Sequence, residues 1–122
     1  MTISRIVPYL ESADFEAVKG FYVDVLGLEV AMEEPDTPAY LGLASSANRS
    51  AQIVVAAEGV EQPLPRFGVD VGDAKAVDSA HAEATRRGLE VVYPLTDEPW
   101  GIRRFFVRDP AGAVVSVLAH LE

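Results

Sequence analysis

The sequence contains no cysteine among its 122 residues. Disulfide bonds, iron–sulfur clusters, thiolate zinc sites and cysteine nucleophiles are therefore excluded. The lack of cysteine is consistent with the reducing cytosol. The N-terminal residues also lack an apolar run of signal-peptide length, and charged residues interrupt every later apolar stretch before it could span a bilayer. We therefore expect a cytoplasmic protein.

Basic residues are few. The 10 lysines and arginines against 19 aspartates and glutamates give a net charge of −9. A surface with this charge repels phosphate backbones and anionic lipid headgroups over about a Debye length. We therefore expect neither a nucleic acid nor a membrane as partner, and we expect cationic ligands to be attracted.

Histidine is scarce, with His81 in a predicted helix and His120 near the C-terminal end of the sequence. The two do not have the spacing of a metal-binding pair. We expect both to be solvated or packing residues, so a histidine-based metal site or general base is not predicted.

The residues that are present predict a folded domain. Hydrophobic residues make up 49% of the chain and charged residues 24%. This balance is typical of a globular protein and not of a disordered or fibrous one. The length matches a single domain, which would bury roughly two-thirds of the surface of the unfolded chain.

A short repeat divides the chain into two halves, because Gly27-Leu28-Glu29-Val30 recurs as Gly88-Leu89-Glu90-Val91. Each copy follows a predicted helix that begins at an aspartate, Asp14 or Asp73, and ends at the glycine of the repeat. The apolar positions of these helices are Phe15, Val18, Tyr22, Val25 and Leu26 in the first and Val77, Ala80 and Ala84 in the second. The repeat indicates a duplicated unit.

Strands are predicted around each helix, and residues 66–71 show the clearest alternation of apolar and polar side chains. The predicted strands are 6–11, 28–33, 39–44 and 51–57 in the first half, and 66–71, 89–93, 102–108 and 113–119 in the second. The segment Glu58–Pro65 breaks both periodicities and is the natural linker. We therefore predict an α+β fold of two βαβββ modules, residues 1–62 and 63–122, that form a curved, partly open barrel around a cavity.

Three segments connect this pattern to a known family: Asp14 with Phe21-Tyr22, the run Leu26-Gly27-Leu28, and the closing Phe106-Val107-Arg108-Asp109-Pro110-Ala111-Gly112. With the paired modules, they resemble the vicinal oxygen chelate superfamily. This superfamily contains glyoxalase I, extradiol dioxygenases, fosfomycin-resistance enzymes and bleomycin-resistance binding proteins. The residues Asp109-Pro110-Ala111-Gly112 themselves have hairpin-turn chemistry, so we assign them no catalytic role.

In metal-using members, the resemblance implies ligands on the first and last strand of each module. The matching positions in this sequence are Val7, Val54, Arg66 and Ser116. Valine has no donor atom, arginine is permanently cationic, and a neutral serine hydroxyl binds metal weakly. We therefore expect no metal and no other cofactor, as in the metal-free bleomycin-resistance-like proteins.

The second half supplies most candidate ligand contacts. Trp100, between a proline and a glycine, is expected on a loop where its ring covers a cavity and stacks on a ligand, or staples the loop to the protein or to a second subunit. By resemblance, Arg104 and Phe106 face the cavity together with Ser116 and Leu118. Arg104 is weighed equally as an anion-binding residue and as a solvated one.

Carboxylates and tyrosines complete the candidate set. Glu11 and Asp70 occupy equivalent positions in the two modules and are candidates for binding a cation or for acting as a general base. For Asp70, an ion pair with Arg104 or Arg66 is the alternative and the more expected one. Tyr9 and Tyr40 could supply ring faces and hydroxyl donors, although strand tyrosines are more often core or rim residues.

The leading hypothesis is a metal-independent small-molecule-binding protein that sequesters a basic aromatic compound. A second hypothesis is a metal-independent isomerase, cyclase or hydrolase that uses Glu11 or Asp70 as base and Arg104 to stabilise negative charge. A metal-dependent glyoxalase or dioxygenase ranks last. The resemblance also implies a homodimer, since open sheets would otherwise expose strand edges.

Overall fold

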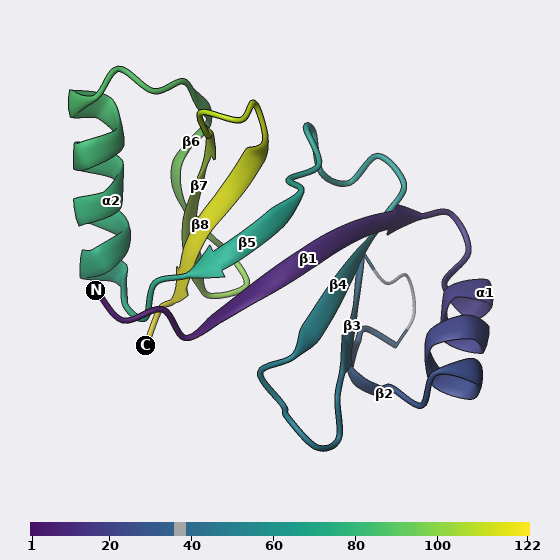
Figure 1. Cartoon of the computed structure of the whole chain (residues 1–122). Helices are drawn as coiled ribbons and strands as arrows, with labels where there is room; N and C mark the ends of the chain where they lie inside the picture. Colours follow the sequence, from purple (N-terminus) through teal and green to yellow (C-terminus); the bar gives the residue numbers. More distant parts are fainter. Residues whose placement is uncertain (36–38) are drawn as a thin grey trace. The chain divides into compact units, whose positions relative to one another are not determined.

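The computed structural model describes residues 1–35 and 39–122, which form two compact units of helix and sheet (Figure 1). Unit 1 contains Met1–Ile6 and Pro65–Glu122, and unit 2 contains Val7–Leu64. Among the described residues, no helix is both long and apolar enough to cross a membrane.

Unit 2 is a four-stranded sheet with one helical segment. Its elements are β1 (Arg5–Ser12, whose first two residues belong to unit 1), α1 (Phe15–Lys19), η1 (Gly20–Val25), β2 (Glu29–Glu33), β3 (Tyr40–Ala44) and β4 (Gln52–Ala57). The strand order is β2-β3-β4-β1, in which β1 runs parallel to β4 and the other pairs are antiparallel.

The helical segment of unit 2 begins where the sequence predicts. The Asp14 side chain accepts a hydrogen bond from the Ala17 amide at 3.0 Å and so caps α1. The second part, η1, is a π-helix and not the regular helix expected as far as Gly27. The wider turns change which side chains face the sheet, so that Val25 and Leu26, predicted to be on the apolar face, are exposed.

The core of unit 2 lies between this helix and the sheet. Leu41, Leu43 and Val55 are fully buried at its centre. Phe15, Val18 and Tyr22 from the helix pack on them, together with Val23, Leu28 and Ile53. The predicted apolar helix face is therefore confirmed in its first half only.

Unit 1 repeats the same arrangement. Its elements are β5 (Phe67–Asp70), α2 (Ala74–Arg86), β6 (Val91–Glu98), β7 (Ile102–Arg108) and β8 (Val114–His120). The strand order is β5-β8-β7-β6, in which β5 runs parallel to β8 and the other pairs are antiparallel. The N-terminal segment joins this unit through the Ser4 amide, which donates to the Asp70 carbonyl at 2.8 Å.

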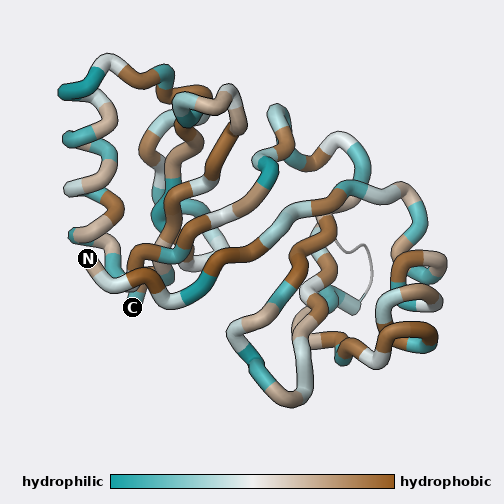
Figure 2. The backbone as a smooth tube through the Cα atoms, in the orientation of Figure 1, coloured by the Kyte–Doolittle hydropathy of each residue, from teal (hydrophilic) through white to brown (hydrophobic). Residues whose placement is uncertain are grey.

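The core of unit 1 lies between α2 and one face of its sheet, and Figure 2 shows hydrophilic residues on the side of α2 that faces away from the strands. Val77 and Ala84 of α2 are buried against Phe105, Val107, Val71, Val115 and Ala119. His81 packs edge-to-face on Phe105, with ring centroids 5.0 Å apart. His81 is thus a helix-packing residue, one of the two roles predicted for it.

The sixth strand is longer than expected. The sequence predicts a strand over 89–93, but β6 continues to Glu98 because β7 supplies backbone partners as far as the pair Glu98 and Ile102. Two register shifts, between Val91 and Tyr93 and between Tyr93 and Thr96, interrupt the pairing. A proline has no amide hydrogen to donate, and such irregularities allow Pro94 to lie within the strand.

The predicted α+β fold of two βαβββ modules is confirmed, and the repeated glycines have the same role in both. Gly27 and Gly88 have φ angles of 83° and 70°, which end the two helices in the left-handed conformation. Leu28 and Leu89, which follow them, pack on the cores of their units. The closure of the two modules around a common cavity stays a prediction.

Candidate functional site

The face of the unit 1 sheet that points away from α2 holds most of the predicted site residues. Alternation along β7 sends Phe105 and Val107 into the core, so Arg104 and Phe106 lie on the opposite face. Across the β7–β8 pair, Arg104 is opposite Leu118 and Phe106 is opposite Ser116. The structure therefore brings these four predicted residues together, and their role as ligand contacts stays a prediction.

Arg104 is the centre of a compact polar and aromatic cluster. Its side chain is 10% exposed, and its Nε donates to Glu98 Oε2 at 2.7 Å. The Tyr93 hydroxyl donates to the same oxygen at 2.8 Å. The guanidinium carbon lies 4.9 Å from the Phe106 ring centroid, 5.1 Å from that of Tyr93 and 5.3 Å from that of Trp100. Since cation–π attraction acts within about 6 Å, the cation is held by three rings and one carboxylate.

The Arg104 environment excludes one of the two roles predicted for it, and the other, anion binding, stays a prediction. A buried guanidinium in an ion pair is not a solvated surface residue, so that alternative is wrong. The expected alternative for Asp70, a pair with Arg104 or Arg66, is also wrong, because the Asp70 carboxylate pairs with Arg5 instead, at 3.2 Å.

Trp100 lies on the turn between β6 and β7, as predicted. Its turn is closed by the Gly101 amide, which donates to the Glu98 carbonyl at 3.0 Å, and Gly101 has a φ of 90°. The Trp100 side chain is 52% exposed even though Arg104 lies against its ring. One part of the ring thus stabilises the turn, and the other remains accessible.

Asp70 is buried, with an exposed fraction of 6%, and its partners come from the chain itself. Its Oδ2 accepts from Arg5 Nε at 3.2 Å, and its Oδ1 accepts from the Gly72 amide at 3.1 Å. Arg5 also contacts His120 Nε2 at 3.1 Å. Both carboxylate oxygens therefore have a structural role, and the binding of a cationic ligand by Asp70 stays a prediction.

Ser116 is fully buried on β8. Across the sheet it lies opposite Phe106 on one side and Gly68 on the other. Of the described residues, none provides a hydrogen-bond partner for the Ser116 hydroxyl. A buried hydroxyl without a partner costs about 1–3 kcal/mol, so this group is a stability cost in the fold as it stands.

The remaining predicted contacts, Tyr9, Glu11 and Tyr40, belong to unit 2. Tyr9 is opposite Val54, and both Glu11 and Tyr40 are opposite Ala56. They share the sheet face that points away from the α1 and η1 helix. The Tyr40 hydroxyl donates to Glu61 at 2.6 Å, and the Glu11 carboxylate accepts from the Gly59 amide at 3.2 Å.

Sequence reasoning missed three residues of these networks, Tyr93, Glu98 and Glu61. Tyr93 and Glu98 fell at or beyond the predicted end of a strand that is in fact longer, and Glu61 fell in the linker. Glu98 and Glu61 are both 8% exposed. The one available signal was a glutamate followed by proline and tryptophan near an arginine-rich strand, which does not specify an ion pair.

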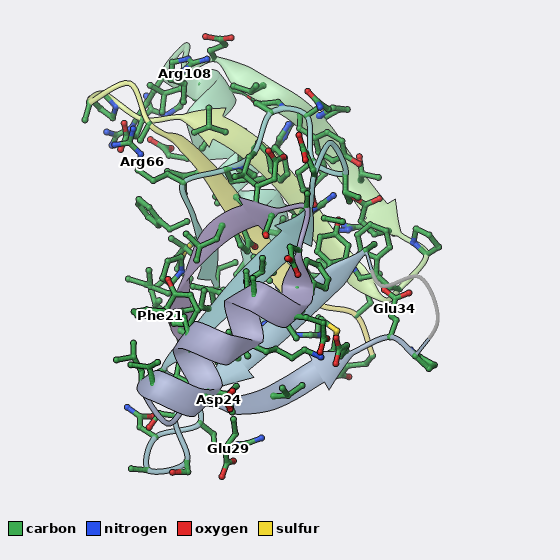
Figure 3. All side chains as sticks on the ribbon, turned by 90° about the vertical axis from the view of Figure 1, so that its right-hand side faces the viewer. Phe21, Asp24, Glu29, Glu34, Arg66 and Arg108 are labelled. Carbon is green, nitrogen blue, oxygen red and sulfur yellow. The ribbon has the colours of Figure 1, made fainter. Side chains whose placement is uncertain are left out.

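A metal centre does not fit the residues present. Val7 and Ser116 are buried and offer at most one hydroxyl, and Arg66 is exposed and cationic (Figure 3). Across residues 1–35 and 39–122, no group of three histidine, cysteine, aspartate or glutamate side chains could hold a metal ion. Metal independence stays a prediction that these observations support.

Among the described residues, a hollow in each unit lies away from the predicted contacts. One of 540 Å³ borders the start of α2 and includes Thr2, Asp73 and Lys75, and one of 390 Å³ borders Ser12 and Phe15. They contain none of the predicted ligand-binding residues. We therefore base the candidate site on side-chain chemistry and not on these hollows.

Comparison with known proteins identifies the family. The family model described as "Glyoxalase/Bleomycin resistance protein/Dioxygenase superfamily" matches residues 3–117. The chain belongs to this superfamily. Among curated proteins, none matches the chain significantly.

Solved structures with the superfamily fold are similar over nearly the whole chain. A superfamily member from Vibrio splendidus 12B01 is 19% identical, with a TM-score of 0.65 and coverage of 97% of this chain and 99% of that one. Methylmalonyl-CoA epimerase from Mycobacterium tuberculosis is 17% identical, with a TM-score of 0.71 and coverage of 99% and 89%. A variant of homoprotocatechuate 2,3-dioxygenase from Brevibacterium fuscum is 24% identical, with a TM-score of 0.70 and coverage of 99% of this chain and 33% of that one. At these identities the similarity shows the fold alone, because the superfamily supports several chemistries.

Proposed function

We propose that this chain is a metal-independent small-molecule-binding protein of the superfamily, and that it sequesters a compound with a flat aromatic part and a positive charge. The observation that carries the proposal is the Arg104 cluster, in which Tyr93, Trp100 and Phe106 surround a buried ion pair. Rings held in this way form a rigid apolar wall, and the half-exposed Trp100 is the part a ligand can reach.

Binding is favoured over catalysis because the carboxylates of this face already have partners. Both oxygens of Asp70 accept hydrogen bonds, and one oxygen of Glu98 accepts two. A general base must reach the proton that it removes. The Asp70 and Glu98 carboxylates act instead as anchors for Arg5 and Arg104, which argues against the isomerase, cyclase or hydrolase hypothesis for Asp70.

The preference for a cation rests on the whole chain and not on one carboxylate. The net charge is −9, whereas the two buried acidic groups of this face are each matched by an arginine. Long-range attraction then raises the rate of encounter with a cation, and ring stacking supplies the retained affinity. Tyr9, Glu11 and Tyr40 of unit 2 stay predicted contacts of the same ligand.

The test is a titration with 9-aminoacridine, a flat cation. Binding is monitored through the fluorescence emission of Trp100, the single tryptophan of the chain. We expect a saturable change, and we expect the association rate to fall as ionic strength rises because salt screens the attraction. By calorimetry, Trp100→Ala should weaken binding by about 1–3 kcal/mol, as for a buried aromatic anchor.

Phe21→Ala is the matched control. Phe21 is an aromatic residue with a similar exposed fraction, 50% against 52%, and it projects from the helix of unit 2 to the surface (Figure 3). Its removal should leave affinity unchanged. If only the anionic 2-naphthoate saturates the signal, and Arg104→Ala abolishes that binding, the ligand is an anion and the cation proposal is wrong.

A further inference from the structure

The helical segment of unit 2 carries three large apolar side chains that project into solvent. Phe21, Val25 and Leu26 are 50%, 68% and 59% exposed. The π-helical turn brings them together, because the Leu26 amide donates to the Phe21 carbonyl at 3.1 Å, which places Leu26 and Val25 one turn beyond Phe21. The three side chains therefore form one apolar flank of η1.

The charged side chains of the same helical segment lie on its other flank. Lys19 hydrogen-bonds Glu33 of β2 at 3.0 Å and also pairs with Glu16 at 2.6 Å. Figure 3 shows Asp24 on the side of the helix towards β2 and Phe21 on the side towards β1. The helical segment is therefore charged towards β2 and apolar towards β1.

Strand β1 continues the apolar flank on the sheet. Leu10 is paired with Val55, a core residue beneath the helix, so Leu10 is on the face of the sheet that carries the helix. Pro8 shares this face by alternation, and both side chains are exposed. These two residues and the three of η1 are named the helix–β1 surface: Pro8, Leu10, Phe21, Val25 and Leu26.

The equivalent helix of unit 1 has no apolar flank. Of the large apolar side chains that are exposed in the described chain, none belongs to α2. Figure 2 shows hydrophilic residues on the outward side of α2, although a core of the same kind lies beneath it. The fold therefore does not require an apolar flank, and exposing one costs free energy that a partner would recover.

We infer that the helix–β1 surface is the interface through which two copies of this chain associate about a two-fold axis. A two-fold interface opposes the same surface on both copies, so the surface must be complementary to itself. All five side chains are uncharged, so two copies can meet here without opposing like charges, although each has a net charge of −9. The same net charge disfavours nucleic acids and anionic lipid surfaces as occupants.

The size of the helix–β1 surface matches what a dimer needs. At these exposed fractions, five side chains of this size present on the order of 400 Å² of apolar area. A stable dimer buries roughly 800 Å² on each partner, of which about 60% is apolar. The helix–β1 surface therefore supplies most of the apolar area that one partner contributes.

Sedimentation equilibrium of the full chain and of lysine variants tests the inference. Val25→Lys should raise the dissociation constant of the dimer by about 100-fold or more, because each copy would bury an unpaired charge against the other. Val30→Lys is the matched control, since Val30 is a 43%-exposed valine of β2, the strand on the charged side of the helix. This control should dimerise as the wild type does, and circular dichroism checks that both variants are folded.

A fluorescent label supplies a second measurement that adds no charge to the surface. The chain has no cysteine, so Val25→Cys offers a single site for the dye acrylodan. The dye emission should shift to shorter wavelength as the protein is concentrated from nanomolar to high micromolar, because association removes the dye from water. Acrylodan on Val30→Cys should show no such shift.

Four results would overturn the inference. The first is a wild-type chain that stays monomeric at every concentration, and the second is dimerisation of Val25→Lys with the affinity of the wild type. Equal dissociation of Val30→Lys and Val25→Lys would place the interface elsewhere. Binding of monomeric wild-type chain to phosphatidylcholine vesicles, lost in Val25→Lys, would make a lipid surface the occupant. All four are measured without a ligand, so they leave the proposed function untouched.

Discussion

Gly20 and Gly27 lie in one helical segment but have opposite backbone conformations. Gly20 is right-handed, with φ −55° and ψ −39°, whereas Gly27 has a φ of 83°. Apart from the neighbouring residues and the backbone of the same helix, a Cβ atom added at either position would meet no atom within 4 Å. Any difference between their alanine variants must therefore come from the backbone.

We predict opposite effects of these two substitutions on the free energy of unfolding. Gly20→Ala should raise it by about 0.5–1 kcal/mol, because alanine restricts the unfolded chain and favours the helix. Gly27→Ala should lower it by about 1–2 kcal/mol, because left-handed backbone is unfavourable for alanine. Urea denaturation measures both, and a loss of similar size for the two variants would contradict the assigned helix end.

Glu83 near the end of α2 predicts a second effect at the residue scale. The guanidinium groups of Arg86 and Arg87 hydrogen-bond its carboxylate and lower the pKa of Glu83 to about 2. A carboxyl with a depressed pKa stabilises the fold above its ordinary pKa, and this contribution is lost as the pH falls toward the depressed value.

Glu83→Gln should therefore melt below the wild type at pH 7, and the difference should vanish near pH 2. High salt should reduce the difference at pH 7, since the pairs are exposed. Melting curves from pH 2 to 7 provide the measurement. A difference that stays constant with pH would show that the ion pairs do not stabilise α2.

At this scale, sequence reasoning succeeds for contacts near in the chain and fails for distant ones. The Asp14 and Asp73 caps act within three residues and are predictable from local chemistry. Arg5, which pairs with Asp70, is 65 residues away, so its identity depends on how the N-terminal segment joins unit 1. The orphan hydroxyl of Ser116 is likewise a property of packing and has no signature in one sequence.

Two adjacent carboxylates of β6 form ion pairs with β7, one buried and one more exposed, so the hairpin shows how burial changes the contribution of an ion pair to stability. Glu98 and Asp97 each pair with an arginine of β7, Arg104 and Arg103, with shortest distances of 2.7 and 2.6 Å. The Glu98–Arg104 side chains are 7% and 10% exposed, whereas those of Asp97 and Arg103 are 51% and 28% exposed. The two pairs therefore differ in solvation, and Arg103 also has a second carboxylate partner, Asp78, at 2.7 Å.

We predict that Glu98→Gln destabilises the fold by about 3 kcal/mol, because the buried Arg104 cation loses its carboxylate. Asp97→Asn should have a much smaller effect, since water screens exposed pairs. Chemical denaturation of both variants provides the measurement. If the two variants lose similar amounts of unfolding free energy, the Arg104 cluster is not shielded from water. That result would also weaken the proposal that its rings bind a ligand.

Element types were predictable, but some element boundaries were not. Among the described residues, seven of the eight strands agree with the predicted ranges to within one residue at each end, because alternation and turn residues bound them on both sides. The end of β6 depends on its pairing with β7. The alternation of residues within a single segment carries no information about that partner. The π-helical turns of η1 also lack a periodic signature that separates them from an ordinary helix.

The outer strands of the two units have features that oppose pairing with another chain. In β2, a bulge lies between Val30 and Met32, and the strand has only five residues. In β6, two register shifts accompany Pro94. Short strands, bulges and proline all protect sheet edges. A homodimer, as the sequence predicts, would therefore associate through side chains and not by extending β2 or β6.

For the whole molecule we predict a dimer of twice 13.1 kDa in sedimentation equilibrium at high micromolar concentration. Met32→Lys, which adds a charge to the 45%-exposed Met32 of β2, should leave this mass unchanged. A monomer at all concentrations would contradict the dimer. Dissociation of the variant alone would show that the edge of β2 is the interface.

The parallel pairing of β5 with β8 sets an order of events during synthesis. Phe67 at the start of β5 lies opposite Val115, so the first strand of the unit has no lateral β8 partner until the last strand has left the ribosome. The hydrogen bond from the Ser4 amide to the Asp70 carbonyl likewise cannot form until Asp70 has been synthesised. At about 5–20 residues per second, this delay lasts several seconds. Unit 2, a continuous stretch from Val7 to Leu64, can complete its four strands during that time, and the emerging β5 is the segment that a chaperone would find uncovered.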